Sequence, residues 1–188
     1  MIKPMLAQKV NTKPIDWTNK VFVQPKLDGI RCIFTKDGAY SRNHKQFKNV
    51  DHLQDDLQDF FKKFPDIVLD GELYNHALKQ DFEKIISLVR KQKPSEQDRS
   101  EASDLVQFHV YDVITEPNFT YEFRHNMLAL QLPIAKSITL IKNTVVENLD
   151  EAKMLHDVHL AQGYEGSMLR LNAFYEQKRS YNLQKFKD

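Results

Sequence analysis

Short runs of β-branched and aromatic residues dominate the first third of the chain and predict strands at residues 20–23, 29–35 and 39–41. The pair Asp37-Gly38 predicts a two-residue hairpin turn between the last two of these strands. From residue 50 the period changes, because apolar residues recur at helical spacing as far as Phe64. Pro65 then predicts the end of that helix.

The remainder of the chain mixes both periods. Strands are predicted at residues 67–73, 105–114, 138–146, 167–171 and 183–186, and helices at 82–89 and 121–132. A further helix should start at Asn148, which forms a capping-box pattern with Glu151, and stop at Gly163. Residues 91–104 are polar and rich in helix breakers, which predicts a mobile loop. Strands and helices do not alternate strictly, so we expect an α+β domain of mainly antiparallel sheets flanked by helices, spanning residues 1–188.

Composition excludes several classes of protein. The chain has 188 residues, 41% hydrophobic and 28% charged, which is ordinary usage for one globular domain with a core. No apolar run approaches the roughly 18 residues of a membrane span, and the first residues lack the apolar stretch of a secretory signal. A single cysteine, Cys32, excludes an internal disulfide. We therefore expect no membrane association and a cytoplasmic location, in a bacterium or a virus-infected cell, or a nuclear one.

Charge and histidine spacing add little on their own. The net charge is +1, so any basic surface for nucleic acid must be local. The best candidate is a C-terminal stretch of basic residues interleaved with aromatic ones: Lys178, Arg179, Lys185 and Lys187, with Tyr175, Tyr181 and Phe186. We consider six of the seven histidines as metal ligands, but they lack the spacing of a zinc site, and we interpret them as surface or core residues: His44, His76, His109, His125, His156 and His159.

Lys26-Leu27-Asp28-Gly29, between two predicted strands, is the first candidate for chemistry. A lysine with the ordinary pKa of about 10.4 is a charged surface residue and a poor nucleophile. A cleft that removes water and adds neighbouring cations favours the neutral, reactive amine. The Asp-Gly turn would hold Lys26 at a fixed point between the strands. Alone, however, this tetrad is a weak signal, because most such tetrads are hairpin turns with an exposed lysine.

Further short motifs follow in a fixed order along the chain. They are Arg31, Ser41-Arg42-Asn43, Asp70-Gly71-Glu72-Leu73, the run 108–113 (Phe-His-Val-Tyr-Asp-Val), the run 165–170 (Glu-Gly-Ser-Met-Leu-Arg) and the run 183–187 (Leu-Gln-Lys-Phe-Lys). This ordered set resembles the covalent nucleotidyltransferase superfamily, which comprises ATP-dependent DNA ligases, RNA ligases and mRNA capping enzymes. Pro4-Met5-Leu6-Ala7 and the forms of the runs at 26–31 and 165–170 look most like small viral or bacterial DNA ligases.

The resemblance implies a nucleotidyltransferase (ATP-grasp-like) fold and a catalytic role for three lysines. Lys26 would be the nucleophile that takes AMP from ATP, and Lys185 and Lys187 would approach the α-phosphate. Glu165 and Glu72 would be the carboxylates near a magnesium ion, although Glu72 is alternatively a ligand of the ribose hydroxyls.

The resemblance also implies residues that bind the nucleotide and the nick. Arg31 and Arg42 would contact the ribose or the phosphate of the nicked strand, since guanidinium groups suit phosphate. Tyr111 would stack on adenine, and the amide of Gln24 would read the edge of the base. AMP would then pass to the 5′-phosphate of nicked double-stranded DNA, and the nick would be sealed.

Relatives of this type carry an OB-fold domain after the nucleotidyltransferase domain. The sequence stops at Asp188, so we expect a monomer that is normally linked to such a C-terminal domain and, without it, an impaired reaction with ATP. Two alternatives within the superfamily stay open, an RNA ligase and a GTP-dependent capping-type enzyme. An alternative of another class is an inactive module that binds nucleotides or DNA. Labelling with ATP, GTP or NAD distinguishes the cofactors, and nicked DNA and RNA substrates distinguish the two kinds of ligase. Intact mass before and after ATP tests the inactive module.

Overall fold

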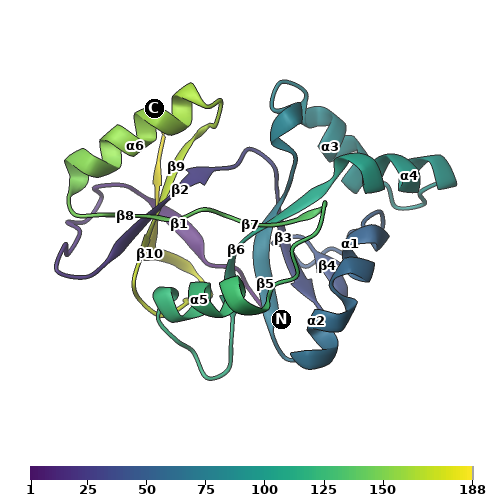
Figure 1. The fold of residues 1–188 in the computed structure, drawn as a ribbon, viewed down its shortest axis with the longest axis horizontal. Helices are drawn as coiled ribbons and strands as arrows, with labels where there is room; N and C mark the ends of the chain where they lie inside the picture. The colour runs from purple at the N-terminus through teal and green to yellow at the C-terminus, as the bar shows by residue number, and fades with distance from the viewer. Residues whose placement is uncertain (188) are drawn as a thin grey trace.

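Two five-stranded sheets lie side by side in the computed structural model, which describes residues 1–187 (Figure 1). Sheet A has the strand order β1 (Leu6–Lys9), β10 (Arg179–Phe186), β9 (Gly166–Leu171), β2 (Val21–Lys26) and β8 (Thr144–Val146). Sheet B has the order β4 (Gly38–Tyr40), β3 (Ile30–Thr35), β5 (Val68–Tyr74), β6 (Gln107–Ile114) and β7 (Ile138–Leu140).

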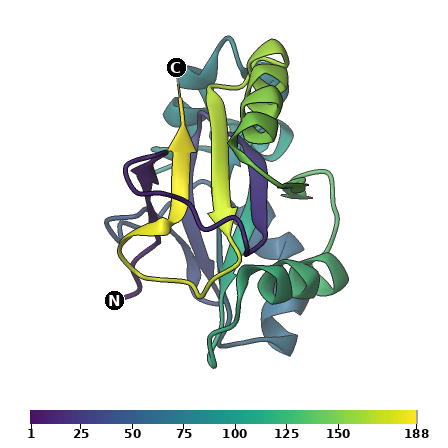
Figure 2. The same cartoon turned by 90° about the vertical axis from the view of Figure 1, so that its left-hand side faces the viewer.

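Helices cover the outer sides of both sheets. Those beside sheet B are α1 (Asp51–Asp56), α2 (Gln58–Lys63), α3 (Phe82–Val89), α4 (Glu96–Leu105) and α5 (Tyr121–Gln131). Sheet A is covered by α6 (Leu149–Ala161), and one 3₁₀ turn, η1 (His76–Leu78), follows β5. The view turned by 90° shows β9 and β10 side by side, with α6 packed to one side of them (Figure 2). No helix among residues 1–187 has the length and apolar character that crossing a bilayer requires.

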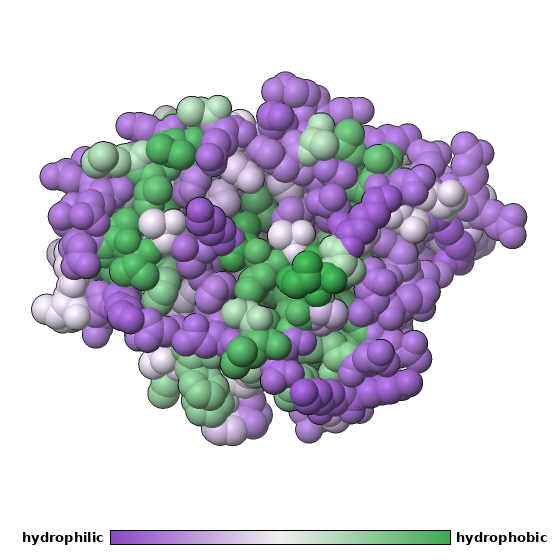
Figure 3. All heavy atoms as spheres, viewed as in Figure 1, coloured by the Kyte–Doolittle hydropathy of each residue, from purple (hydrophilic) through white to green (hydrophobic). Residues whose placement is uncertain are grey.

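The main hydrophobic core lies between sheet B and its helices. Successive side chains of a strand point to opposite faces, so Leu69 and Leu73 of β5 face this core together with Phe108 of β6. Leu53 and Leu57 enter it from the helices. A smaller core of valines, leucine and alanine joins sheet A to α6. Figure 3 shows the outer surface of α4 to be largely hydrophilic, as expected for a helix with one buried face.

The predicted α+β class of mainly antiparallel sheets is confirmed. Six of the eight strand pairings are antiparallel, and β1 with β10 and β6 with β7 are the parallel ones. Strand β1 was not predicted from the sequence, and β10 begins four residues before its predicted start. The predicted helix over 50–64 is interrupted at Leu57, and the hairpin loop is Lys36-Asp37, because Gly38 already pairs with Thr35.

The prediction of a mobile loop at 91–104 is wrong, because α4 occupies residues 96–105. Ser95 is its N-cap and accepts a hydrogen bond from the Asp98 amide, while the Asp98 carboxylate accepts one from the Ser95 amide. This is a capping box with aspartate in the place of the usual glutamate. Ala102 of this helix is buried in the core between sheet B and its helices.

The single strand predicted over 138–146 is also wrong, because it is two strands in different sheets. β7 pairs with β6 in sheet B, and β8 pairs with β2 in sheet A. Between them, Asn143 uses its side chain to bond Tyr121 and Gln24. The apolar run therefore crosses from one sheet to the other, a change that the alternation of side chains does not reveal.

Candidate active site

A cleft of about 570 Å³ opens between the two sheets. Both sheets and α3 contribute to its walls. Among the lining residues are seven of the predicted site residues: Gln24, Lys26, Arg31, Arg42, Glu72, Tyr111 and Lys185. The other two, Glu165 and Lys187, lie beside Lys26 and contact each other. The structure therefore brings together residues that lie up to 163 positions apart in the sequence.

Lys26 is the last residue of β2, and its side chain is held by a carboxylate. Its Nζ donates to Glu165 Oε2 at 3.1 Å, and the two side chains are 23% and 21% exposed. Lys187, just past the end of β10, donates to the other oxygen of Glu165 at 2.5 Å. Glu165 thus bridges the candidate nucleophile and a second lysine. Lys26 faces the cleft and not bulk water.

The charges around Glu165 keep it ionised. Partial burial would raise the pKa of Glu165, but hydrogen bonds from Lys187 and Lys26 outweigh burial, and the pKa is lowered. The same contact raises the pKa of Lys187, chiefly through its hydrogen bond with Glu165. Lys185 lies on β10 opposite Met168 and lines the cleft.

The turn after Lys26 is held against the end of β5. A Cβ atom on Gly29 would lie 2.3 Å from the carbonyl oxygen of Leu73, so only glycine allows this close approach. The Gly29 amide donates to Glu72 Oε2 at 3.1 Å. The Lys-x-Asp-Gly motif therefore has a structural reason for its glycine, and Glu72 fixes the turn that follows the nucleophile.

Glu72 accepts hydrogen bonds from two donors, and its pKa is raised. Tyr111 donates through its hydroxyl to Glu72 Oε1 at 3.1 Å. Burial raises the pKa of Glu72 to about 7, although Arg31 and the Gly29 amide oppose the shift. The carboxyl is therefore close to half protonated at neutral pH, which suits a hydrogen-bonding role towards hydroxyl groups better than a role as a metal ligand.

A bulge in sheet B turns Tyr111 towards the cleft. Asp70 pairs with Asp112 and Gly71 with Val110, so Tyr111 is the extra residue on β6. Two guanidinium groups lie over its ring, Arg170 at 4.8 Å and Arg31 at 5.3 Å from the ring centroid. The sequence prediction that Tyr111 contributes an aromatic surface to the site agrees with this position, and its stacking on adenine stays a proposal.

Arg31 and Arg42 differ in how firmly they are held. Arg31 donates to both carboxylate oxygens of Asp70, at 2.6 and 2.7 Å, and to the backbone oxygen of Met5. It is 17% exposed, so it is fixed in a half-buried ion pair at the cleft wall. Arg42 sits on an exposed turn, which is closed by a backbone hydrogen bond from the Ser41 amide to the Lys45 oxygen and by one from the Lys45 amide to Ser41 Oγ. Arg42 also lines the cleft.

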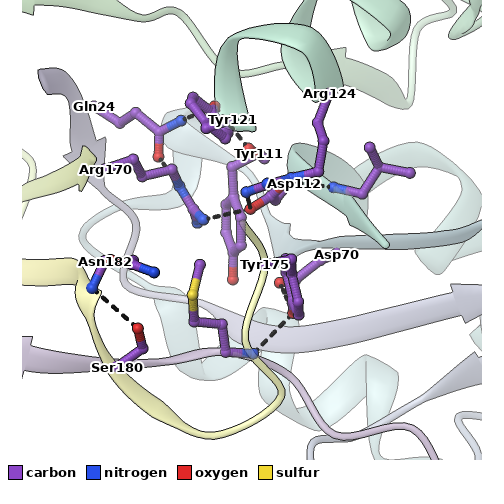
Figure 4. A network of polar contacts seen from close by, with 12 residues as sticks. Gln24, Asp70, Tyr111, Asp112, Tyr121, Arg124, Arg170, Tyr175, Ser180 and Asn182 are labelled. Atoms are coloured by element: carbon purple, nitrogen blue, oxygen red, sulfur yellow. Dashed lines mark hydrogen bonds and ion pairs between the residues drawn. The ribbon is translucent and has the colours of Figure 1, made fainter. Parts of the chain in front are cut away.

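Gln24 is part of a buried polar network (Figure 4). Its amide nitrogen donates to the Tyr121 hydroxyl and to Asn143, and its oxygen accepts from Arg170 at 2.9 Å. Both amide hydrogens are therefore already used. For Gln24 to read a base edge, as the sequence predicted, its nitrogen would have to release one of these partners.

Arg170 and Asp112 are important residues to which the sequence analysis assigned no role. Asp112 is fully buried and accepts from Arg170 at 2.9 Å and from Arg124 at 2.8 and 3.1 Å. Both residues stand inside the motifs noticed in the sequence, but the pairing between sheets A and B was invisible there. Phe82 and Ile86 of α3 and Arg90, which follows the helix, also line the cleft, and the sequence indicated no site role for them.

The two carboxylates predicted near a metal line different cavities. Glu72 lines the main cleft, whereas Glu165 lines a smaller cavity of about 160 Å³ with Asp28 and Tyr164. Among residues 1–187 no cluster of three or more potential metal ligands is found. Glu165, which is ionised and lies beside Lys26, is the better candidate for a metal ligand of the two.

Comparisons of the sequence point to one family. The model of the ATP dependent DNA ligase domain matches residues 4–187. The DNA ligase of African swine fever virus (strain Badajoz 1971 Vero-adapted) is 29% identical over 192 residues, which cover 94% of this chain and 43% of the viral protein. The DNA ligase of enterobacteria phage T4 is 25% identical over 233 residues, covering 98% of this chain and 48% of the phage protein. The chain spans less than half the length of these curated relatives.

Solved structures show the same fold. A structure from a study of Lig E DNA ligases aligns with a TM-score of 0.79 at 22% identity, over 100% of this chain and 69% of that one. Chlorella virus DNA ligase-adenylate aligns with a TM-score of 0.71 at 21% identity, over 99% of this chain and 67% of that one. The nucleotidyltransferase fold and the resemblance inferred from the motifs are both confirmed. The chain belongs to the ATP-dependent DNA ligase domain family.

Proposed function

We propose that this domain takes AMP from ATP onto Lys26 and passes it to the 5′-phosphate of nicked double-stranded DNA, as the first steps of nick sealing. The observation that carries the proposal is the position of Lys26. Its Nζ lies at the wall of an open cleft and contacts Glu165, whose second oxygen holds Lys187. An amine fixed in this way is oriented for attack on a bound phosphate.

The first step forms one bond and breaks one bond. The lone pair of Lys26 Nζ attacks the α-phosphorus of ATP, the N–P bond forms, and the P–O bond to the β-phosphate breaks, so pyrophosphate leaves. The amine must lose its protons in the process, and Glu165 Oε2 at 3.1 Å is the nearest acceptor that the structure offers. Lys185 and Lys187 would neutralise charge on the phosphate oxygens.

The remaining cleft residues suit the rest of the nucleotide. Glu72 is the candidate for the ribose hydroxyls, because its pKa of about 7 lets it both donate and accept hydrogen bonds. Tyr111 offers its ring to the base. Arg31 is held by Asp70, whereas Arg42 has no carboxylate partner within residues 1–187, and both are candidates for phosphate contacts.

The site can offer a divalent cation one protein carboxylate, that of Glu165. Magnesium typically binds one or two protein carboxylates together with substrate phosphates. Glu165 is ionised and would be its protein ligand, once one of the two lysines released an oxygen. When bound, the ion would neutralise negative charge on the phosphates of ATP.

In the later steps AMP moves from Lys26 to the 5′-phosphate, the P–N bond breaks, and a P–O–P linkage forms. The 3′-hydroxyl of the nick then attacks the 5′-phosphate, a phosphodiester forms, and AMP leaves. Lys26 carries AMP through the first two steps and is not needed for the third. Nicked DNA pre-adenylylated at its 5′ end therefore tests sealing separately from the reaction with ATP.

The direct test is the intact mass of the chain before and after incubation with ATP and magnesium. We expect a gain of one AMP in the wild type and no gain in Lys26→Ala. Parallel incubations with GTP and NAD distinguish a ligase of this kind from a capping-type enzyme, since labelling by GTP alone would contradict the proposal. Nicked DNA and nicked RNA then separate the two kinds of ligase.

A further inference from the structure

His76 connects the two sheets at a place outside the cleft lining. It lies in η1, directly after β5 of sheet B. Its Nε2 is 2.8 Å from the backbone oxygen of Gln162, which belongs to the turn between α6 and β9 of sheet A. Its ring stacks on that of Tyr164, with centroids 4.1 Å apart and planes 17° from parallel. The His76 side chain thus contacts this turn twice, through a hydrogen bond and through stacking on the Tyr164 ring.

The second nitrogen of His76 is held from its own sheet. The Tyr74 hydroxyl lies 2.6 Å from Nδ1. A backbone carbonyl can only accept, so Nε2 carries the hydrogen and Nδ1 accepts the hydroxyl proton of Tyr74. Tyr74 is 3% exposed and packs with Leu27, the residue after Lys26. The His76 imidazole is therefore hydrogen-bonded at both nitrogens. One of its two partners, Tyr74, packs against the turn that begins after Lys26.

The turn that His76 contacts leads directly to Glu165, whose carboxylate binds Lys26. Tyr164 immediately precedes Glu165, whose Oε2 receives Lys26 Nζ. Gly163, two residues before Glu165, has φ +90°, and a Cβ there would lie 2.6 Å from Cδ of Lys79, just after η1. The turn is thus packed closely against η1, and His76 sets its distance from β5.

We propose that His76 is a positioning residue that fixes Glu165, and through it Lys26 Nζ, for the attack on ATP. The proposal rests on the function proposed above. His76 itself does not line the nucleotide cleft, so its loss should leave ATP binding nearly intact. A displacement of reacting atoms by about 1 Å can slow a reaction about a hundredfold, so a loosened Glu165 should lower the rate of the chemical step.

The test is single-turnover formation of the AMP adduct over a range of ATP concentrations, followed by intact mass. We expect His76→Ala to lower the maximal rate by about tenfold or more, with less than about a twofold change in the ATP concentration at half-maximal rate. His76→Gln should recover part of the rate, since its amide nitrogen can donate to the Gln162 oxygen as Nε2 does.

His52→Ala is the matched control. His52 also donates through Nε2 to a backbone oxygen at 2.8 Å, that of Val106, and it is also half-buried, but it lies on α1 away from the cleft. We expect its thermal stability to fall about as much as that of His76→Ala, with an unchanged adenylylation rate. A rate for His76→Ala equal to that of His52→Ala, or a loss confined to ATP affinity, overturns the proposal. Absence of AMP on the wild type would instead contradict the proposed function and this role with it.

Discussion

At the scale of single residues, Glu165 is the group that holds the candidate nucleophile in place. It holds Lys26 and Lys187 on separate oxygens, and its lowered pKa keeps it charged at neutral pH. In this arrangement Lys26 is well oriented but still a hydrogen-bond donor. On our proposal, a bound nucleotide and cation compete for these same charges, so binding would loosen the ion pair just where the amine must become a nucleophile.

Glu72 should make the stability of the fold depend on pH. Its pKa is raised from the ordinary 4.5 to about 7, so the folded state binds its proton more tightly than the unfolded state. The stability that this provides is complete below about pH 4.5 and is lost as the pH rises through about 7, a difference on the order of 2–3 kcal/mol. Glu72→Gln, which has no proton to lose, should therefore gain relative to the wild type as the pH rises.

Urea unfolding of both proteins between about pH 5 and 8 measures this difference. The control is Glu101→Gln on the exposed face of α4, where a hydrogen bond from Lys84 lowers the pKa of the carboxyl. Its difference from the wild type should stay flat over this range, because both states are ionised there. A flat difference for Glu72→Gln as well would show that Glu72 is not protonated in the fold.

The resemblance of the motifs to the nucleotidyltransferase superfamily was sufficient to predict Lys26, Glu165 and Lys187 in one site, and their contacts agree with it. The hydrogen-bond partners of the site residues were harder to predict. Gln24 was predicted to read a base, but its amide is used by Tyr121 and Asn143. Those partners come from another helix and from a crossing segment, and no local pattern indicates such contacts.

Among the elements, α4 shows how capping decides a boundary. Ser95 and Asp98 exchange hydrogen bonds at its N-terminus, and without them a polar ten-residue helix has little reason to start there. The Ser-x-x-Asp pattern was present in the sequence, but the polar composition around it indicated a loop. By contrast, α6 was predicted correctly from Asn148 to Gly163, since its cap pattern precedes a clear apolar period.

Ser95→Ala should destabilise the chain by about 1 kcal/mol, because it removes the acceptor for the Asp98 amide. Ser100→Ala, on the exposed side of the same helix, serves as control and should be neutral or slightly stabilising, since alanine is the better helix former. Thermal unfolding of the two variants measures the difference. Equal effects would mean that the cap does not contribute to stability.

At the scale of the whole molecule, the two sheets are joined by buried charge. Asp112 of sheet B receives Arg170 of sheet A and Arg124 of α5, and the three side chains are at most 2% exposed. Arg124 also donates to the backbone oxygens of Phe119 and Ala173. Figure 4 shows this network, and two of its members, Gln24 and Arg170, also line the cleft. Neither the pairing nor the crossing of β7 and β8 between sheets could be predicted from local sequence.

Asp112→Asn should cost about 3–5 kcal/mol, because it leaves two buried guanidinium groups facing an amide without charge. The control is Glu122→Gln, which removes the partner of Lys20 in an exposed pair of side chains 54% and 38% accessible. That change should cost less than about 1 kcal/mol. Urea unfolding midpoints of both variants compare them, and similar losses would contradict a dominant role for the buried network.

The central claim is that Lys26, and no other nucleophile, carries AMP. Peptide mapping by mass spectrometry after incubation with ATP and magnesium tests it most directly. We expect the adduct on the peptide that contains Lys26, with a fragmentation series that places it on that side chain. An AMP adduct on any other residue, or an undiminished adduct in Lys26→Ala, would contradict the mechanism.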